Sequence, residues 1–96
     1  MENELIYLYQ AEWCPYCANV RSKLTDLEID YLTIKVPRAK ADRDDLFQVS
    51  GQRGIPTLVH GDVLIADDDE AINAYLDTLD AEAQKAVVIP REAVGS

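Results

Sequence analysis

The chain has 96 residues, of which 48% are hydrophobic and 28% are charged, and its formal net charge at pH 7 is −9. This length suits one domain with four or five elements of secondary structure. So acidic a protein is not attracted to nucleic acid or to an anionic membrane surface, and both are excluded as partners. No apolar run approaches the ~20 residues of a membrane span, and residues 1–4 lack the basic and apolar regions of a signal peptide. We therefore expect a cytoplasmic protein.

The first expected elements are a strand at 5–9 and a helix at about 15–27. The strand is predicted from a nearly continuous apolar run, Leu-Ile-Tyr-Leu-Tyr, which is typical of a strand covered on both faces. In the helical segment, a stripe at helical spacing predicts the buried residues Cys17, Val20, Leu24 and Leu27. Residues 31–36 are rich in β-branched and aromatic side chains and predict a second strand, parallel to the first.

A short helix is expected next, at 42–49. Asp42 is the predicted N-cap, and Leu46 and Val49 are predicted to form the inner face. The helix is expected to end at Gly51, which follows a serine.

The second half of the chain predicts a hairpin and a last helix. Two short apolar runs at 57–59 and 63–65 are separated by His-Gly-Asp, which indicates antiparallel strands joined by a tight turn. The acidic residues at 67–70 favour a helix start. A stripe at i, i+3, i+4 and i+7 predicts the inner face of this helix as Ile72, Tyr75, Leu76 and Leu79.

The helical pattern weakens after residue 80. Residues 81–88 either prolong the last helix or form a short separate one, and residues 90–96 are expected to be a mobile tail. We therefore expect a domain at 1–80 and a C-terminal extension, partly helical or mobile, at 81–96.

The two cysteines of the chain, Cys14 and Cys17, are predicted to lie at the start of the first helix. A helix N-terminus favours an anion, so Cys14 is expected to ionise easily and to act as the nucleophile. Pro15 suits the first helical turn, where its missing N–H would have had no partner. Cys17 is expected to be the resolving thiol, which attacks a mixed disulfide formed at Cys14. Such a pair beside a β-α-β pattern in a reducing compartment indicates redox activity.

Two structural roles for the cysteines are the alternatives. A structural zinc site needs four ligands, and the single histidine, His60, brings the set to three at most. A structural disulfide is the other alternative, although closing so small a loop would constrain the unfolded chain little.

Two motifs resemble the glutaredoxins, which have the thioredoxin fold. Residues 13–17, Trp-Cys-Pro-Tyr-Cys, match the Cys-Pro-Tyr-Cys active site of dithiol glutaredoxins. Residues 50–56, Ser-Gly-Gln-Arg-Gly-Ile-Pro, are similar to their Thr-Gly-Gln-Arg-Thr-Val-Pro segment, although Gly-Ile-Pro-Thr at 54–57 looks more like thioredoxin. Residues 68–72 resemble a segment in the N-terminal domain of glutathione transferases. The resemblance implies an α/β thioredoxin-like fold, with a central mixed four-stranded sheet and flanking helices in the order β-α-β-α-β-β-α.

The resemblance also implies which residues bind the substrate. It implies a cis peptide bond before Pro56, which would turn the backbone of Ile55 toward a thiol substrate. Arg43 falls where glutaredoxins place a residue toward the glycyl carboxylate of glutathione, and Asp69 falls at the γ-glutamyl end. Glutaredoxins usually have a lysine where this chain has Ala11. The substrate-binding set implied in this way is Trp13, Pro15, Tyr16, Arg43, Ile55, Pro56, Asp68 and Asp69. Simpler alternatives are that the proline merely starts a strand and that the tryptophan and tyrosine are ordinary exposed aromatic residues.

These features together predict a thiol–disulfide oxidoreductase that acts on protein or low-molecular-weight disulfides. No tightly bound cofactor is expected; glutathione or another small thiol is the expected reductant, and a thioredoxin-type reductase is a further candidate partner. The alternatives are an iron–sulfur cluster carrier, which Pro15 argues against because cluster-binding relatives generally replace that proline, and an interaction module with redox-inert cysteines.

Overall fold

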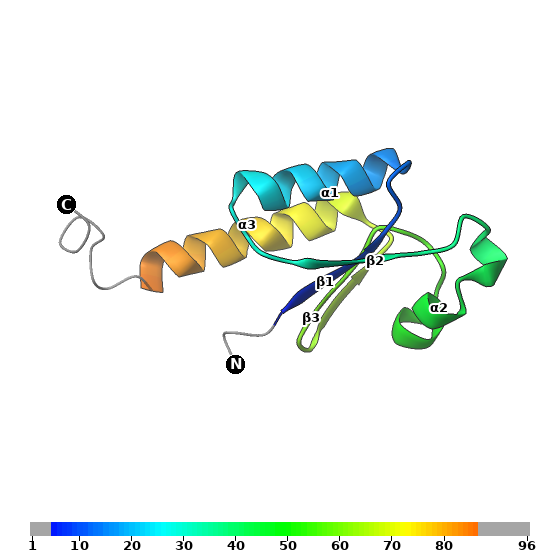
Figure 1. Ribbon diagram of the computed structural model, residues 1–96. Helices are drawn as coiled ribbons and strands as arrows, with labels where there is room; N and C mark the ends of the chain where they lie inside the picture. The colour runs from blue at the N-terminus through cyan, green and yellow to red at the C-terminus, as the bar shows by residue number, and fades with distance from the viewer. Residues whose placement is uncertain (1–4, 87–96) are drawn as a thin grey trace.

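A four-stranded mixed sheet lies at the centre of the protein (Figure 1). The computed structural model describes residues 5–86. The elements in chain order are β1 (Ile6–Gln10), α1 (Pro15–Asp26), β2 (Leu32–Lys35), a 3-10 turn (Lys40–Asp42), α2 (Asp44–Ser50), β3 (Thr57–His60), β4 (Val63–Ala66) and α3 (Asp69–Ala86). The strands lie side by side in the order β2-β1-β3-β4. The predicted thioredoxin-like fold and its order of elements are confirmed.

The strand pairing follows the sequence prediction. β1 is parallel to β2 and antiparallel to β3, and β3 and β4 form the expected antiparallel hairpin. One row of residues in register crosses all four strands: Leu32, Tyr7, Val59 and Leu64. Three members of this row, on β2, β1 and β4, are large side chains that stay exposed. The row therefore lies on a face of the sheet that this part of the chain leaves largely uncovered.

The main hydrophobic core lies between the sheet and the two long helices. Figure 1 shows α1 and α3 running along the same face of the sheet. The fully or nearly fully buried residues of this core are Ile6, Leu8, Val20, Leu24, Leu58, Ile72 and Leu76. The helical stripes predicted from the sequence account for the contributions of α1 and α3. An ion pair between Lys23 and Asp77, with a nitrogen–oxygen distance of 2.8 Å, connects the two helices at the surface.

The expectation that β1 is covered on both faces is wrong. Ile6 and Leu8 are buried, but Tyr7 between them is 37% exposed. The helices α1 and α3 share one face, and α2 lies toward one end of the sheet rather than over the other face (Figure 1). The strand therefore alternates between buried and exposed side chains, although the sequence reads as a continuous apolar run.

The expected start and inner face of α2 also need correction. Residues 40–42 form a 3-10 turn, in which Arg43 N–H donates to the carbonyl of Lys40. The helix therefore begins after Arg43, and Asp42 is not its N-cap. Leu46 is buried as expected, but Val49 is exposed because this short helix has only one side against the body of the protein. The predicted end is confirmed, since Gly51 has the left-handed conformation of a helix C-cap, with φ of 75°.

The last helix, α3, begins at Asp69 and continues to Ala86. The carboxylate of Asp68 accepts a hydrogen bond from the backbone N–H of Ala71 at 3.0 Å, as an N-cap residue does. The expected boundary at residue 80 falls inside this helix, and the tail expected at 90–96 lies outside the described residues. Within residues 5–86, no helix is both long and apolar enough to cross a membrane.

The two leucines of the β3–β4 hairpin give a matched test of the core. Leu58→Ala should lower the free energy of unfolding by about 2–5 kcal/mol, because Leu58 is fully buried. Leu64→Ala should cost only about 0.5–1 kcal/mol, because Leu64 is 44% exposed. Urea unfolding followed by circular dichroism measures both values. Equal losses for the two substitutions would contradict this placement of the core.

Candidate active site

The two cysteines lie where the chain passes from β1 into α1. Cys14 has extended backbone angles, with φ of −85° and ψ of 120°, and stands as the N-cap of α1, with Pro15 at the first helical position. Its backbone N–H donates to the carbonyl of Ala11 at 3.2 Å, and its carbonyl accepts from the N–H of Ala18 at 3.1 Å. The predicted placement of Cys14 at the mouth of the helix is confirmed.

Both thiols are free and belong to a second core cluster at the end of the sheet. Cys14 is 6% exposed, whereas Cys17 is fully buried. The other buried members of this cluster are Ala11, Val36, Leu46 and Ile55, and Tyr9 packs against them. The buried stripe of α1 therefore includes Cys17, as predicted.

Burial raises the pKa of the Cys17 thiol from its ordinary value of 9.0 to about 12. The neighbouring Cys14 raises this pKa further, whereas a backbone hydrogen bond with Ala11 and the positive charge of Arg21 lower it. At neutral pH the Cys17 thiol therefore holds its proton. It can attack a sulfur atom only if its surroundings favour loss of that proton during the reaction.

A groove of about 240 Å³ lies beside the helix start and is lined by Tyr16, Ile55, Pro56, Asp67 and Asp69. The peptide bond between Ile55 and Pro56 is cis, as the resemblance implied. Four residues of the predicted substrate-binding set thus share one groove. Asp67, the fifth, was not predicted to bind substrate.

Asp67 and Gly54 form a pair that the sequence alone did not reveal. Asp67 has a left-handed backbone, with φ of 56°, and its N–H donates to the carbonyl of Pro56 at 2.8 Å. Its carboxylate occupies the space beside Gly54, because a Cβ added to that glycine would lie 2.3 Å from Asp67 Cγ. The only signal in the sequence was a glycine where glutaredoxins have threonine.

The two remaining acidic positions of the groove region have different roles. The carboxylate of Asp69 accepts a hydrogen bond from the side-chain amide of Asn19 at 2.9 Å, which joins the start of α3 to α1. Asp68 caps α3 and is absent from the groove lining. Of these two predicted residues, the structure brings Asp69 to the groove.

Two exposed aromatic residues flank the cysteine motif. Trp13 is 48% exposed and Tyr16 is 61% exposed. The guanidinium of Arg38 lies over the Trp13 ring, 4.7 Å from its centroid, which is a cation–π contact. Arg38 was not among the residues predicted to bind substrate. In the structure Arg38 lies beside the cysteine motif, where its guanidinium packs on the Trp13 side chain.

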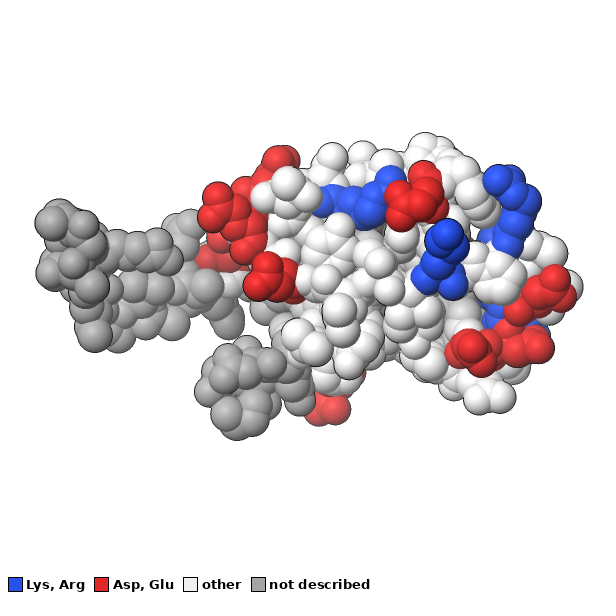
Figure 2. Space-filling model, in the orientation of Figure 1, with Lys and Arg blue, Asp and Glu red and all other residues white. Residues whose placement is uncertain are grey.

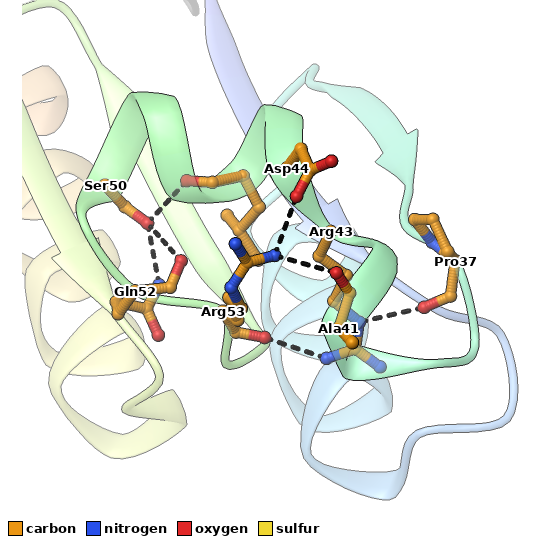
Figure 3. Close-up of polar contacts among 8 residues, drawn as sticks. Pro37, Ala41, Arg43, Asp44, Ser50, Gln52 and Arg53 are labelled. Atoms are coloured by element: carbon orange, nitrogen blue, oxygen red, sulfur yellow. Dashed lines mark hydrogen bonds and ion pairs between the residues drawn. The ribbon is translucent and has the colours of Figure 1, made fainter.

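Arg43 is not among the residues that line the groove, and it binds the backbone of two loops (Figure 3). It is only 5% exposed. Its Nε donates to the carbonyl of Pro37 at 2.8 Å, its Nη1 to that of Arg53 at 2.9 Å and its Nη2 to that of Arg38 at 3.1 Å. Each guanidinium nitrogen thus has a partner within the protein. Arg43 fastens the segment before Pro56 to the loop after β2.

A second set of hydrogen bonds shapes the approach to the cis proline. Gln52 Nε2 donates to the hydroxyl of Thr57 at 3.0 Å, and Gln52 Oε1 accepts from the N–H of Gly54 at 2.6 Å. The Thr57 hydroxyl in turn donates to the carbonyl of Gly54 at 2.9 Å. These contacts join the two ends of the turn that contains Ile55 and Pro56. The turn is therefore fixed by its own side chains.

The described residues contain no group of three His, Cys, Asp or Glu side chains placed to hold a metal ion. Cys14 can form a mixed disulfide, and Cys17 is close enough on the same helix to displace it.

Comparison with known proteins identifies the family of the chain. The glutaredoxin family model matches residues 6–65. An uncharacterised glutaredoxin-like protein of 8.6 kDa, found in the rubredoxin operon of Clostridium pasteurianum, is 24% identical over 62 residues, which cover 64% of this chain and 83% of that protein. The chain belongs to the glutaredoxin family.

Solved structures show the same fold both as part of a longer protein and as most of a small one. A glutathione transferase homologue from Drosophila mojavensis with bound glutathione is 27% identical, with a TM-score of 0.71 over 78% of this chain and 35% of that one. The chain thus spans about a third of the length of that transferase. A glutaredoxin from Archaeoglobus fulgidus is 18% identical, with a TM-score of 0.60 over 77% of this chain and 87% of that one.

The different surroundings of the two thiols should appear in their alkylation rates. At pH 8 a thiol with a pKa near 12 is ionised in about one molecule in ten thousand. Cys17→Ser, which retains Cys14, should therefore react with iodoacetamide much faster than Cys14→Ser. In Cys14→Ser the pKa of Cys17 stays raised, because burial, its largest cause, remains and only the smaller effect of Cys14 is lost. Equal rates for the two variants would contradict the predicted order of reactivity.

The contact between Gly54 and Asp67 can be tested by a double-mutant cycle. Gly54→Ala should destabilise the fold by about 1–3 kcal/mol, because the new methyl group collides with the Asp67 carboxylate. The same substitution in an Asp67→Ala background should cost less, with a coupling of about 0.5–3 kcal/mol. Chemical unfolding of the four proteins gives the coupling. Additive effects would mean that the two residues do not compete for this space.

Proposed function

We propose that the protein is a dithiol thiol–disulfide oxidoreductase that reduces protein or low-molecular-weight disulfides. The observation that carries this proposal is the asymmetry of its cysteine pair. Cys14 caps the start of α1 and packs in the cluster that includes Ile55, a residue of the groove, whereas Cys17 is fully buried on the next turn. A nucleophile at the helix start that keeps a small exposed area, with a fully buried, protonated thiol behind it, suits the two successive steps of disulfide reduction.

In the first step, the Cys14 thiolate attacks one sulfur of the substrate disulfide and releases the other half as a thiolate. The product is a mixed disulfide between Cys14 and the substrate. In the second step, Cys17 loses its proton and attacks the Cys14 sulfur, which closes the intramolecular disulfide and releases the second substrate thiolate. Two electrons pass from the dithiol to the substrate, and two thiols of an external donor then reduce the protein.

The groove suggests how a substrate would lie during these steps. An extended segment beside the cis proline would pair with the backbone of Ile55, and Tyr16 would form one wall. The carboxylates of Asp67 and Asp69 favour an ammonium group in the groove. Trp13 and its stacked Arg38 do not line this groove but flank the cysteine motif, where the cation suits a carboxylate.

Glutathione or another small thiol is the proposed electron donor. The family membership supports this choice, as does the fold shared with a transferase homologue that binds glutathione. A thioredoxin-type reductase is the competing donor, since the turn at 54–57 has the thioredoxin-like sequence Gly-Ile-Pro-Thr. A reactive pair of cysteines at this spacing suits a reducing compartment such as the cytoplasm.

A coupled assay distinguishes the two donors. NADPH oxidation is followed with a mixed-disulfide substrate in the presence of glutathione and glutathione reductase, and separately with thioredoxin reductase. We expect turnover with glutathione that is abolished by Cys14→Ser. Cys17→Ser should retain part of the activity toward glutathionylated substrates, because glutathione can replace the resolving thiol. Turnover by Cys14→Ser, or none by the unaltered protein with either donor, would contradict the proposed function.

A further inference from the structure

The strongest unexplained contact near the cysteines belongs to Arg21, an interior residue of α1. Its side chain lies on the same helix face as Cys17, one turn further on. The guanidinium Nη1 donates to the backbone carbonyl of Ala11, at 3.3 Å, and to the side-chain oxygen of Gln10. Gln10 ends β1 and is almost fully buried. Arg21 thus connects the helix that carries both thiols to the turn that precedes them.

Ala11 is the point at which this arginine meets the cysteine pair. Its carbonyl accepts both the Arg21 guanidinium and the backbone N–H of Cys14, and its backbone also makes a hydrogen bond with Cys17. Glutaredoxins usually have a lysine at this position. Here Ala11 has no charge of its own, and the guanidinium of Arg21 reaches its backbone carbonyl from α1.

We infer that Arg21 is a positioning residue for the resolving step: it holds the turn before Cys14 and supplies the positive charge under which Cys17 gives up its proton. The inference rests on the proposed function, because it concerns the second step of that reaction. In this step the proton of Cys17 passes to solvent, a bond forms between the two cysteine sulfurs, and the bond from Cys14 to the substrate breaks. The substrate leaves as a thiolate with the electron pair.

The need for such a charge follows from the burial of Cys17. Solvent does not surround the fully buried Cys17 sulfur, so its thiolate depends on the hydrogen bond with the Ala11 backbone and on the nearby positive charge of Arg21. Cys14 opposes ionisation of Cys17, and Arg21 favours it. The side chain of Arg21 is 24% exposed, so its charge is only partly screened by solvent.

One carboxylate partly offsets this charge. Glu12 Oε1 lies 4.0 Å from Arg21 Nη2, and Glu12 Oε2 accepts a hydrogen bond from Gln10 Nε2 at 3.1 Å. The side chain of Glu12 is 68% exposed, so water weakens its effect on the buried thiol. Removal of this carboxylate should therefore favour ionisation of Cys17, whereas removal of the guanidinium should oppose it.

The reaction with 5,5′-dithiobis(2-nitrobenzoate) separates the two steps in one trace. Attack by Cys14 releases one thionitrobenzoate, and attack by Cys17 on the resulting mixed disulfide releases the second. Arg21→Met should slow the second release about threefold at a given pH, because a tenfold loss corresponds to one pKa unit and the charge of Arg21 has the smallest effect among the groups that shift the Cys17 pKa. Lys23→Met is the matched control, because it removes the same charge from the same helix but disrupts only the ion pair with Asp77. Its second release should stay within about twofold of the unaltered protein.

Two further variants separate the charge from the packing of Arg21. Arg21→Lys keeps the charge, so it should recover most of the rate of the second release. If Arg21 had a purely structural role, the rate would depend on the hydrogen bonds of the guanidinium, and lysine would not recover it. Glu12→Gln should accelerate the second release. Both variants keep the inference testable if Arg21→Met does not fold, which thermal unfolding of each protein would show.

The outcomes separate this inference from the proposed function. Absence of the first release in the unaltered protein would overturn the proposed function. If the first release is normal and the second release is equally fast in Arg21→Met and Lys23→Met, only the role of Arg21 would be overturned. Failure of Arg21→Lys to recover the rate, or a slower second release in Glu12→Gln, would overturn the role of its charge.

Discussion

The packing of α1 against the sheet is the interaction on which the site depends. It is driven by the stripe of Val20 and Leu24, both fully buried, and the same stripe includes Cys17. Because the helix begins at the cysteine motif, Cys14 is left at its N-terminus while its partner enters the core. The chemical difference between two identical side chains thus arises from the same packing that stabilises the fold.

The sequence predicted the features that depend on local pattern. The α1 stripe, the hairpin and the helix end at Gly51 follow from spacing and turn chemistry, and the structure confirms them. Contacts between distant segments were not predictable, because no periodic pattern marks them. Arg43 looked like a ligand for a carboxylate but binds three backbone carbonyls. The contact of Asp67 with Gly54 joins residues thirteen positions apart, and only the fold brings them together.

The charges of the molecule are distributed unevenly, which the net value of −9 conceals. Five of the nine Lys and Arg residues lie within positions 35–53, a segment with three acidic residues. On the face seen in Figure 2, the blue side chains lie over the centre and right, whereas the described residues at the left carry red ones. The segment that includes Arg38 and fastens the cis-proline turn is therefore the basic part of an acidic protein. A substrate approaching the cysteines meets both signs of charge within one small area.

The row of exposed side chains across the sheet has a consequence for how the molecules behave toward one another. Tyr7, Leu32 and Leu64 offer neighbouring copies an apolar surface on which they could stack. Each copy also carries nine excess negative charges, whose repulsion extends about 8 Å at physiological ionic strength. Colloidal repulsion thus opposes the association that an uncovered sheet face would otherwise favour. The acidity of the chain thus acts against association through the sheet face that residues 5–86 leave exposed.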